Sequence, residues 1–410
     1  MPDYHETSGA SSSSQDDKNE KRLSGSAKEG SSAADKNLNI DIPSISLPKG
    51  GGAIKSIDEK FEVNAASGSA SLSIPLPTAS IRGFSASLNV SYNSGRGNSS
   101  FGLGWGLNLP SIKRKTDKEL PQYFDESDSD GYIFSGAEDL VPKMKFSDGK
   151  WELEETDSAD GQFRIRRYCP RIEGAFAKIE RWTKKSDGII HWQCVSKNNV
   201  TAVYGNTSTS VIADPADARK IFEWFIHFTY DDKGNCAIYE YKQEDGDGMP
   251  TMLHNKNRIN GNAVSVNTYL KRVRTGNIDP YLAGNPVPAA SQFLFETVLD
   301  YGEHDTINLP FNETGNWTFR QDAFSMYNAG FEIRNCRLCR RVMLYHHFSE
   351  LPGGSALVTA TKFLYDTNDQ PGPNGRRNCG LCYHYLGFRE KRSSDCETKN
   401  DPAHWIYFEC

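Results

Sequence analysis

Two pairs of cysteines have the spacing of metal-binding knuckles. The pairs are Cys336 with Cys339 and Cys379 with Cys382, and four thiolates in two such pairs are the ligands of a tetrahedral structural zinc site. However, the gap between the pairs is about twice that of common zinc ribbons. The sequence around the first pair, residues 334–345, predicts one continuous strand, on which residues three apart point to opposite faces. We therefore predict no zinc site and keep zinc binding as the open alternative.

Two acidic runs have the composition of calcium-binding loops. They are residues 125–131, DESDSDG, and residues 244–248, EDGDG. When the last glycine of each run takes the sixth position of an EF-hand loop, the twelfth position falls on Ala137 or His254. The motif requires a bidentate glutamate there, so we predict solvated acidic turns.

The remaining residues with catalytic or cofactor-binding potential form no recognisable pattern. His346 and His347 follow a predicted strand, where adjacent side chains diverge, so we expect ordinary hydrogen bonds and not a shared metal ion. The glycine-rich segments 50–52 and 95–106 lack the spacing of a phosphate-binding loop. Neither Gly-x-Ser-x-Gly nor His-Glu-x-x-His occurs in the sequence. We accordingly predict no catalytic residue, no cofactor-binding residue, no metal ligand and no cofactor.

Composition limits the class of partner. The 410 residues carry a formal net charge of −6 and a sequence pI of about 5.9, which gives no basic footprint for nucleic acid. The mean hydropathy is −0.63, and no run reaches the roughly 18 apolar residues of a membrane helix. The nine cysteines are odd in number, and five of them are scattered over the first 368 residues, unlike a disulfide framework. We predict a soluble protein that binds no nucleic acid and does not insert into a membrane.

The chain divides into three parts by composition. Residues 1–42 are rich in Ser, Ala, Gly and charged residues and are predicted to be a disordered leader. They lack the basic and apolar regions of a secretory signal peptide, so we expect synthesis in the cytoplasm and release by another route. Residues 43–368 carry strand patterns, whereas residues 369–410 lose them and hold four of the nine cysteines. We interpret the last part as an atypical tail, truncated or frameshifted.

Period-two alternation of apolar residues predicts strands with one buried face. It occurs in two early segments, at Ala70, Leu72, Ile74 and Leu76 and at Ala86, Leu88, Val90 and Tyr92. In residues 101–107, FGLGWGL, glycines at alternate positions predict a strand with one bare face, against which an aromatic ring or another backbone packs closely. Residues 222–230 and 237–241 form the clearest hairpin, whose turn contains Gly234 and Asn235. Residues 214–220 are read as one short helical turn before it.

The fold class predicted from these patterns is mainly β, with antiparallel multi-stranded sheets and few short helices. The string Tyr230-Asp231-x-x-Gly234-Asn235 resembles the signature of Rhs/YD-repeat proteins, in which successive hairpins add to a long sheet. Residues 365–368, YDTN, are read as a second, degraded copy.

A longer resemblance covers residues 44–366. The stretch SISLPKGGGAIKSIDEKFEVNAASGSASLSIPLP, the block NSSFGLGWGLNLPSIKRKTDKELP and the later blocks IADPADARKIFEWF and FRQDAFSMYNAGFEIRNCRLCRRVMLYHHF are similar to the SpvB-type domain. That domain begins a Salmonella plasmid virulence protein and the B components of insecticidal toxin complexes. The resemblance implies a structural role as part of a hollow shell around a passenger protein. It also implies toxin-complex C and A components as partners, and release to the extracellular region as part of a complex.

In the Salmonella protein, this type of domain precedes an ADP-ribosyltransferase domain, whose family has Ser-Thr-Ser followed by Glu-x-Glu. This chain has Ser208-Thr209-Ser210, but its conspicuous Glu-x-Glu, residues 152–154, comes before that triplet. We therefore predict that this chain is not an enzyme. The alternative function is a stand-alone β-rich binding or adaptor module, or an inactive remnant of a toxin gene.

Overall fold

The computed structural model describes most of the chain between residues 70 and 365. The described ranges are 55–56, 59–63, 70–135, 138–172, 176–259, 266–305, 312–365, 382–384 and 405–407. They all belong to one compact unit, residues 37–410. The predicted leader, 1–42, and most of the predicted tail, 369–410, lie outside the described residues.

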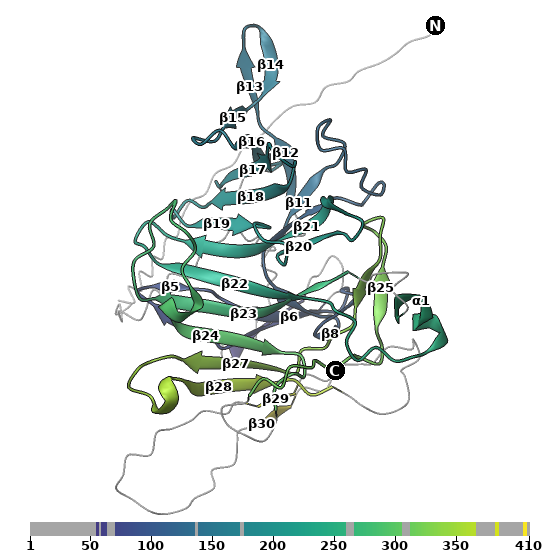
Figure 1. Cartoon of the computed structure of the whole chain (residues 1–410), viewed down its shortest axis with the longest axis vertical. Coiled ribbons are helices and arrows are strands. Elements are labelled where there is room, and N and C mark those ends of the chain that lie inside the picture. Colours follow the sequence, from purple (N-terminus) through teal and green to yellow (C-terminus); the bar gives the residue numbers. More distant parts are fainter. Residues whose placement is uncertain are drawn as a thin grey trace, which may run out of the picture. The chain divides into compact units, whose positions relative to one another are not determined.

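The described chain is mostly strands, as the alternation predicts, and its neighbouring strands run antiparallel (Figure 1). Helical segments are short: η1 (Leu253–Asn255), α1 (Lys256–Ile259), η2 (Ala290–Gln292) and η3 (Pro352–Gly354). No helix among the described residues is long and apolar enough to cross a membrane. The predicted fold class is confirmed.

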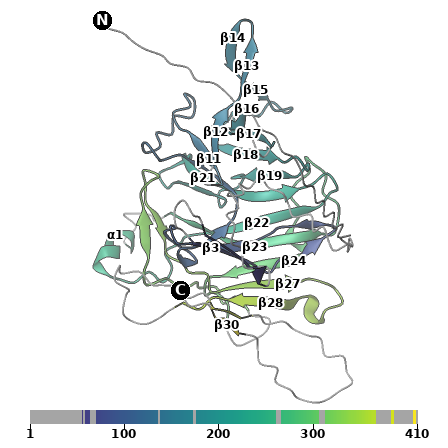
Figure 2. The same cartoon turned by 180° about the vertical axis from the view of Figure 1, so that it is seen from behind.

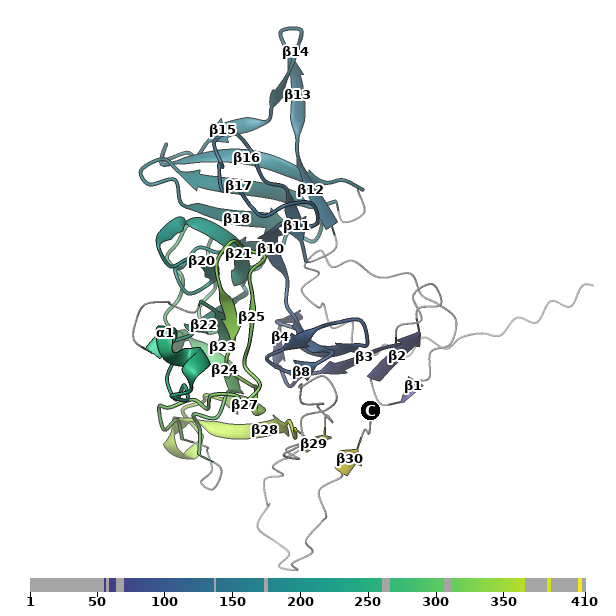
Figure 3. The ribbon, with the colours of Figure 1, turned by 90° about the vertical axis from the view of Figure 1, so that its right-hand side faces the viewer.

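The first sheet is built from the early alternating segments. Its strands, in spatial order, are β1 (Lys55–Ser56), β2 (Glu59–Val63), β3 (Ala70–Pro75), β6 (Asn89–Asn93) and β9 (Trp105–Asn108). Ile74, Val90 and Trp105 are buried and share one hydrophobic core with residues of the second sheet, such as Tyr239 and Leu299. This sheet therefore packs on the second sheet through its apolar face (Figure 3).

Part of the second sheet closes on itself. Eight strands form a ring because β10 pairs with both β11 and β21. The ring runs in the order β10 (Ser111–Arg114), β11 (Tyr132–Phe134), β12 (Glu138–Pro142), β16 (Phe163–Pro170), β17 (Lys178–Lys184), β18 (Ile190–Val195), β19 (Thr201–Tyr204) and β21 (Asp217–Tyr230). A closed ring of this size is a small barrel, whose inward-facing side chains fill its interior.

Aromatic side chains fill the barrel. Cross-strand partners share a face of a sheet, and the register pairs Ile112 with Trp224. Trp224, Trp192, Tyr132 and Tyr168 meet with ring centroids 5.0–6.0 Å apart. Both tryptophans are fully buried, so this cluster forms the centre of the barrel.

Beyond β21 the sheet continues open. The added strands are β22 (Cys236–Gln243), β23 (Thr268–Asn277), β24 (Phe293–Asp300), β27 (Arg341–His346) and β28 (Ala356–Lys362). They lie below the barrel strands in Figure 1 and, turned by 180°, in Figure 2. Two further strands add to the sheet. Strand β15 (Glu155–Asp157) pairs with β16, and strand β20 (Val211–Asp214) pairs with β21.

Small hairpins complete the described structure. They are β4 (Ser80–Ile81) with β5 (Phe84–Ser85), β7 (Asn98–Ser99) with β8 (Gly102–Leu103), β13 (Met144–Ser147) with β14 (Lys150–Leu153), β25 (Phe324–Met326) with β26 (Ile333–Asn335), and β29 (Cys382–His384) with β30 (Trp405–Tyr407).

The hairpin predicted from the clearest alternation is present as β21 and β22, and Gly234 in its turn has φ +84°. Its alternation is interrupted, because β19 pairs Val203 with Phe228 and Tyr204 with Ile226. His227 is thus the extra residue of a β-bulge, which turns Phe228 away from the barrel core. Phe228 accordingly belongs to a separate hydrophobic cluster.

Two local predictions were wrong. Residues 214–220 form a tight turn from β20 to β21 and no helix, since Asp214 Oδ1 accepts the Ala216 N–H at 2.9 Å in place of a helical carbonyl. The glycine-rich segment 101–107 is not one strand, because positive φ values at Gly102 and Gly104 divide it into β8 and β9. The expected close approach of an aromatic ring is found at Gly104, where a Cβ would lie 2.4 Å from the Tyr92 ring, whereas a Cβ at Gly106 would meet the Arg96 side chain.

Candidate functional site

The first acidic run is bound to buried arginines inside the barrel. Arg114 donates to Asp130 at 2.7 Å and to Asp125 at 2.9 Å, and its Nε donates to the Ile221 carbonyl at 2.7 Å. Arg181 donates to Asp128 at 3.2 Å. The prediction of a solvated acidic turn is therefore wrong for residues 125–131. Two cations enclosed by barrel strands need compensating charge, and this loop supplies it.

The electrostatics of this cluster stabilise the charged forms. Burial opposes ionisation of Asp130, but N–H groups of Gln122 and Tyr123 and the Arg114 guanidinium outweigh it and lower the pKa of Asp130. Burial also acts against the Arg114 charge, yet Tyr132 and the two carboxylates raise the pKa of Arg114 overall. Asp130 and Arg114 therefore both stay charged at neutral pH, and their ion pair ties the loop to β10.

The second acidic run has the same kind of partner. Arg337 is fully buried, and its Nε donates to Glu244 at 3.0 Å while its Nη2 lies 3.2 Å from Asp245. Its guanidinium carbon lies 4.2 Å from the Trp317 ring centroid. The prediction of a solvated turn holds for the exposed Asp245 and Asp247 but is wrong for Glu244, whose enclosed carboxylate pairs with the remote Arg337.

One group of described residues has the composition and spacing of a metal site: Asp300, Glu303 and His304, all buried. Their ligand atoms are already engaged by the protein. Asp300 pairs with Arg341 at 2.7 Å, Glu303 pairs with Lys271 at 2.5 Å, and the His304 Nδ1 lies 3.3 Å from Asp300. A metal ion would have to break these buried pairs, so we assign the group a structural role.

The cysteines of the first pair lie in an irregular segment between β26 and β27. The prediction of one strand over residues 334–345 was wrong, because remote parts of the chain bind this backbone. The Cys336 N–H donates to the hydroxyl of Tyr269 in β23, and the Cys339 N–H donates to the Ser100 carbonyl. Burial raises the pKa of Cys336 to about 12 and raises that of Cys339 as well. Both thiols are therefore protonated. Cys379 lies outside the described residues, so zinc binding by the two pairs stays an open alternative.

The other residues singled out in the sequence lie apart. His347 contacts Ser355 at 2.7 Å and Glu296 at 2.9 Å, whereas His346 packs on Phe295 with ring centres 4.8 Å apart. Their side chains diverge as predicted. Residues 208–210 lie in the loop between β19 and β20, and residues 152–154 lie at the end of β14. The transferase-like elements are therefore on different parts of the fold.

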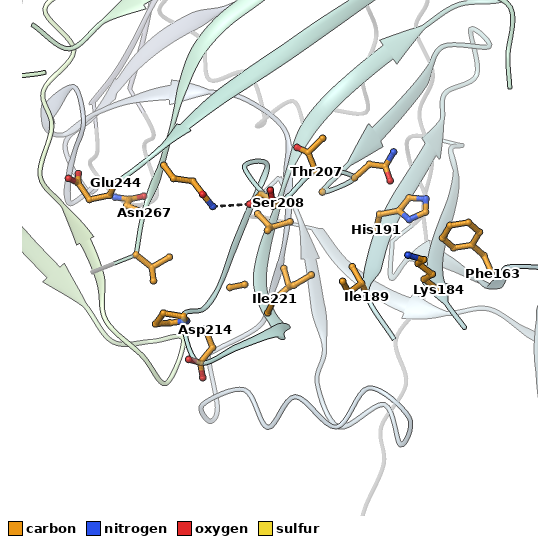
Figure 4. Close-up of a pocket in the computed structure, with 18 residues that line it drawn as sticks. Phe163, Lys184, Ile189, His191, Thr207, Ser208, Asp214, Ile221, Glu244 and Asn267 are labelled. Carbon is orange, nitrogen blue, oxygen red and sulfur yellow. Dashed lines mark hydrogen bonds between the residues drawn. The ribbon is translucent and has the colours of Figure 1, made fainter. Parts of the chain in front are cut away.

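The structure also contains a cavity that the sequence did not indicate. Its volume is about 620 Å³, and its walls come from β16–β18 on one side and from β20 and the start of β21 on the other. Figure 4 shows Phe163, Ile189 and His191 across from Ile221. Gln243 Nε2 donates to the Ser208 carbonyl at 2.9 Å and fixes the loop above the cavity. Mostly apolar walls with a few polar groups are typical of a binding site.

A second surface has the character of a protein contact. Hairpin β13–β14 extends from the barrel strands in Figure 3, and its register pairs Met144 with Leu153 and Phe146 with Trp151. These four apolar residues share one face. Phe146 and Trp151 are 63% and 67% exposed, and exposed apolar faces of this kind mark interaction sites.

Comparison of the sequence with protein families places most of the chain in one of them. Residues 64–348 match the family described as Salmonella virulence plasmid 65kDa B protein. The chain is 34% identical over 338 residues to the mono(ADP-ribosyl)transferase SpvB of Salmonella typhimurium, a match covering 78% of this chain and 54% of that protein. The SpvB of Salmonella choleraesuis strain SC-B67 is also 34% identical, over 339 residues. The chain thus spans about half the length of these curated relatives.

Solved structures agree with the sequence match. The N-terminal domain of effector protein SpvB from Salmonella typhimurium strain LT2 superposes with a TM-score of 0.66 at 30% identity, over 77% of this chain and 98% of that domain. The structure of TcdB2-TccC3 superposes with a TM-score of 0.68 at 30% identity, over 85% of this chain and 17% of that chain. The described residues therefore have the fold of the SpvB N-terminal domain and of part of a toxin-complex component, and the chain belongs to the SpvB family.

Proposed function

We propose that this chain is a non-enzymatic assembly module, which contributes a shell-like domain to a toxin complex and acts in virulence by binding other proteins. Its similarity to TcdB2-TccC3 over 85% of the chain carries this proposal. The partners are proteins of the kind of toxin-complex C and A components, and the complex functions outside the producing cell. Residues 43–368 are the assembly domain, preceded by a leader and followed by an atypical tail.

The chemistry of the buried polar groups supports a structural role. Catalytic acids, bases and nucleophiles must reach a substrate. In the described part of the chain, the densest charged clusters, around Arg114, Arg337 and Asp300, are enclosed and neutralised internally. The matched part of the curated relatives is about half of each, and it corresponds to the SpvB N-terminal domain. An assay for transfer of label from NAD to proteins should accordingly give no product.

The exposed apolar face of hairpin β13–β14 supports protein binding. Trp151 and Phe146 present large rings to solvent, and tryptophan is enriched among the residues that dominate interface energies. A shell subunit and a stand-alone adaptor both need such a face. The extent of the similarity to TcdB2-TccC3 favours the shell subunit.

The test is size-exclusion chromatography with light scattering, with and without a toxin-complex C component. We expect a complex whose mass is the sum of both chains. Trp151→Ser should weaken it by roughly thirtyfold if this face is a hot spot, whereas Lys145→Ser, on the opposite face of the same hairpin, should not. A monodisperse chain that does not bind the C component would refute the shell function and favour the adaptor.

A further inference from the structure

The barrel wall is split beside the cavity. Strand β18 pairs with β19 through residues 192–195 and 201–204. The chain then leaves the sheet as a loop at residues 205–210 and returns as β20, which pairs with β21. Among the described residues, no strand pairs with the other edge of β20. The first residues of β18 and the whole of β20 therefore face each other across a gap in the ladder.

The open edge of β20 has backbone groups available for another strand. The Phe225 N–H donates to the Ser210 carbonyl at 2.8 Å. Since successive residues of an antiparallel strand direct their backbone groups to opposite sides, the N–H and carbonyl of Val211 point away from β21. Across the gap, the Ile190 carbonyl accepts the Trp224 Nε1–H at 2.8 Å, so a side chain replaces the missing strand partner there.

The cavity of about 620 Å³ lies at this gap and has room for side chains of an inserted strand. Val211 and Ala213 from β20 form part of one wall, and Phe163 and Ile189 form part of the other. Its charged lining residues are Lys184, Asp214 and Glu244. Each is paired with a residue outside the lining, so the cavity favours an occupant without net charge. The preferred occupant is therefore an extended, uncharged and largely apolar segment.

His191 offers a polar group to a partner in the cavity. Its side chain lines the cavity, it is 8% exposed, and it has no hydrogen bond to another described residue. Its ring centroid lies 5.3 Å from that of Phe163 and 5.7 Å from that of Trp182. Its ring nitrogens are not among the enclosed side-chain atoms that lack a partner, so they are open to the cavity. A neutral imidazole offers one donor and one acceptor to a ligand.

We propose that an extended segment of a partner protein docks along β20 as an added strand, with an apolar side chain in the cavity and a hydrogen-bonding group on His191. Strand addition explains why an open edge and a deep pocket occur together, since backbone bonds supply affinity and the pocket supplies selectivity. The proposal rests on β18, β20 and the cavity, and it holds whether or not the chain joins a toxin complex.

The experiment uses the full chain and a phage-displayed library of ten-residue peptides as the probe. We expect enrichment of peptides with alternating apolar residues, which shift the amide resonances of Val211 and Ala213 and the ring resonances of His191. Methylation of the peptide backbone nitrogens should abolish binding. His191→Phe should weaken binding about two- to tenfold, the contribution of one hydrogen bond, and Ala213→Trp should fill the cavity and abolish it.

Thermal unfolding of each variant shows whether it folds, and His191→Phe retains the test if Ala213→Trp does not. Failure to enrich any peptide would overturn the proposal, as would peptides that bind equally well when N-methylated or when the cavity is filled. Light scattering identifies the remaining occupant: a dimer of the free chain that dissociates in the Ala213→Trp variant would mean that a second copy fills the gap, which contradicts a partner segment.

Discussion

Replacing His191 by phenylalanine should make the protein less sensitive to acid. The imidazole is buried between Phe163 and Trp182, and this burial lowers the pKa of His191 from 6.5 to about 4. Phenylalanine keeps a ring in the same aromatic cluster but cannot take up a proton. The variant therefore isolates the energy of protonating this one side chain.

The direction and the size of this effect on stability follow from the coupling between proton binding and folding. Between pH 6.5 and 4 the unfolded chain protonates His191 while the folded chain does not, so the free energy of unfolding falls as the pH falls through this window. Each tenfold change in proton affinity is worth about 1.4 kcal/mol. A pKa lowered from 6.5 to about 4 therefore costs about 3 kcal/mol at pH 4, and about 2 kcal/mol of this loss is reached by pH 5.

The assay is urea unfolding of both proteins at pH 7 and pH 5. Carboxylates titrate in both proteins, so their contribution cancels when the two losses of stability are compared. The wild type should lose about 2 kcal/mol more than His191→Phe over this interval. Equal losses, or a His191 titration near pH 6.5 followed by NMR in the folded protein, would refute the burial argument.

Two further substitutions test the packing of the barrel and of the first sheet. Asp130→Asn leaves the Arg114 guanidinium, which is fully buried, short of one charge and should destabilise the fold by about 3 kcal/mol; a loss below about 1 kcal/mol in denaturant would mean that the loop is dispensable. Gly104→Ala places a Cβ 2.4 Å from the Tyr92 ring at a φ of +80° and should cost about 2 kcal/mol. Gly97→Ala, where a Cβ meets nothing within 4 Å, is its matched control, and an equal melting temperature for the two variants would contradict the close approach.

The strands could be predicted because a half-buried strand shows in the sequence as alternating apolar and polar residues. Ile74 and Val90 are buried at the alternating positions expected for them, and Gly234 takes the positive φ that its hairpin turn requires. The close approach of an aromatic ring at Gly104 was also predicted from the glycine spacing, although Gly104 lies between β8 and β9 and not in a strand. These features depend on neighbours a few residues away, which the sequence displays directly.

The ion pairs of the second acidic run were not predictable, because their partner is remote in the sequence. Arg337 lies 93 residues from Glu244, and the acidic run alone gives no sign of it. The barrel was not predicted for the same reason, because its closure depends on the pairing of Ile112 with Trp224, which lie far apart in the sequence. The short helix predicted at residues 214–220 failed because a tight turn between β20 and β21 was the competing local solution.

The topology of β21 accounts for the open edge. This 14-residue strand belongs both to the barrel and to the open sheet, and it pairs with β19 and β20 along one edge and with β22 and β10 along the other. On the second edge, β10 closes the barrel. On the first edge, β18 pairs with β19, and no described strand lies between its start and β20. A strand that serves two sheets therefore leaves one segment of the barrel wall incomplete, and the cavity lies at that segment. If the gap were only a packing defect, apolar side chains would be sufficient to line it. Half of the lining residues are polar instead, and among them His191 directs into the cavity an imidazole that a docked strand would engage.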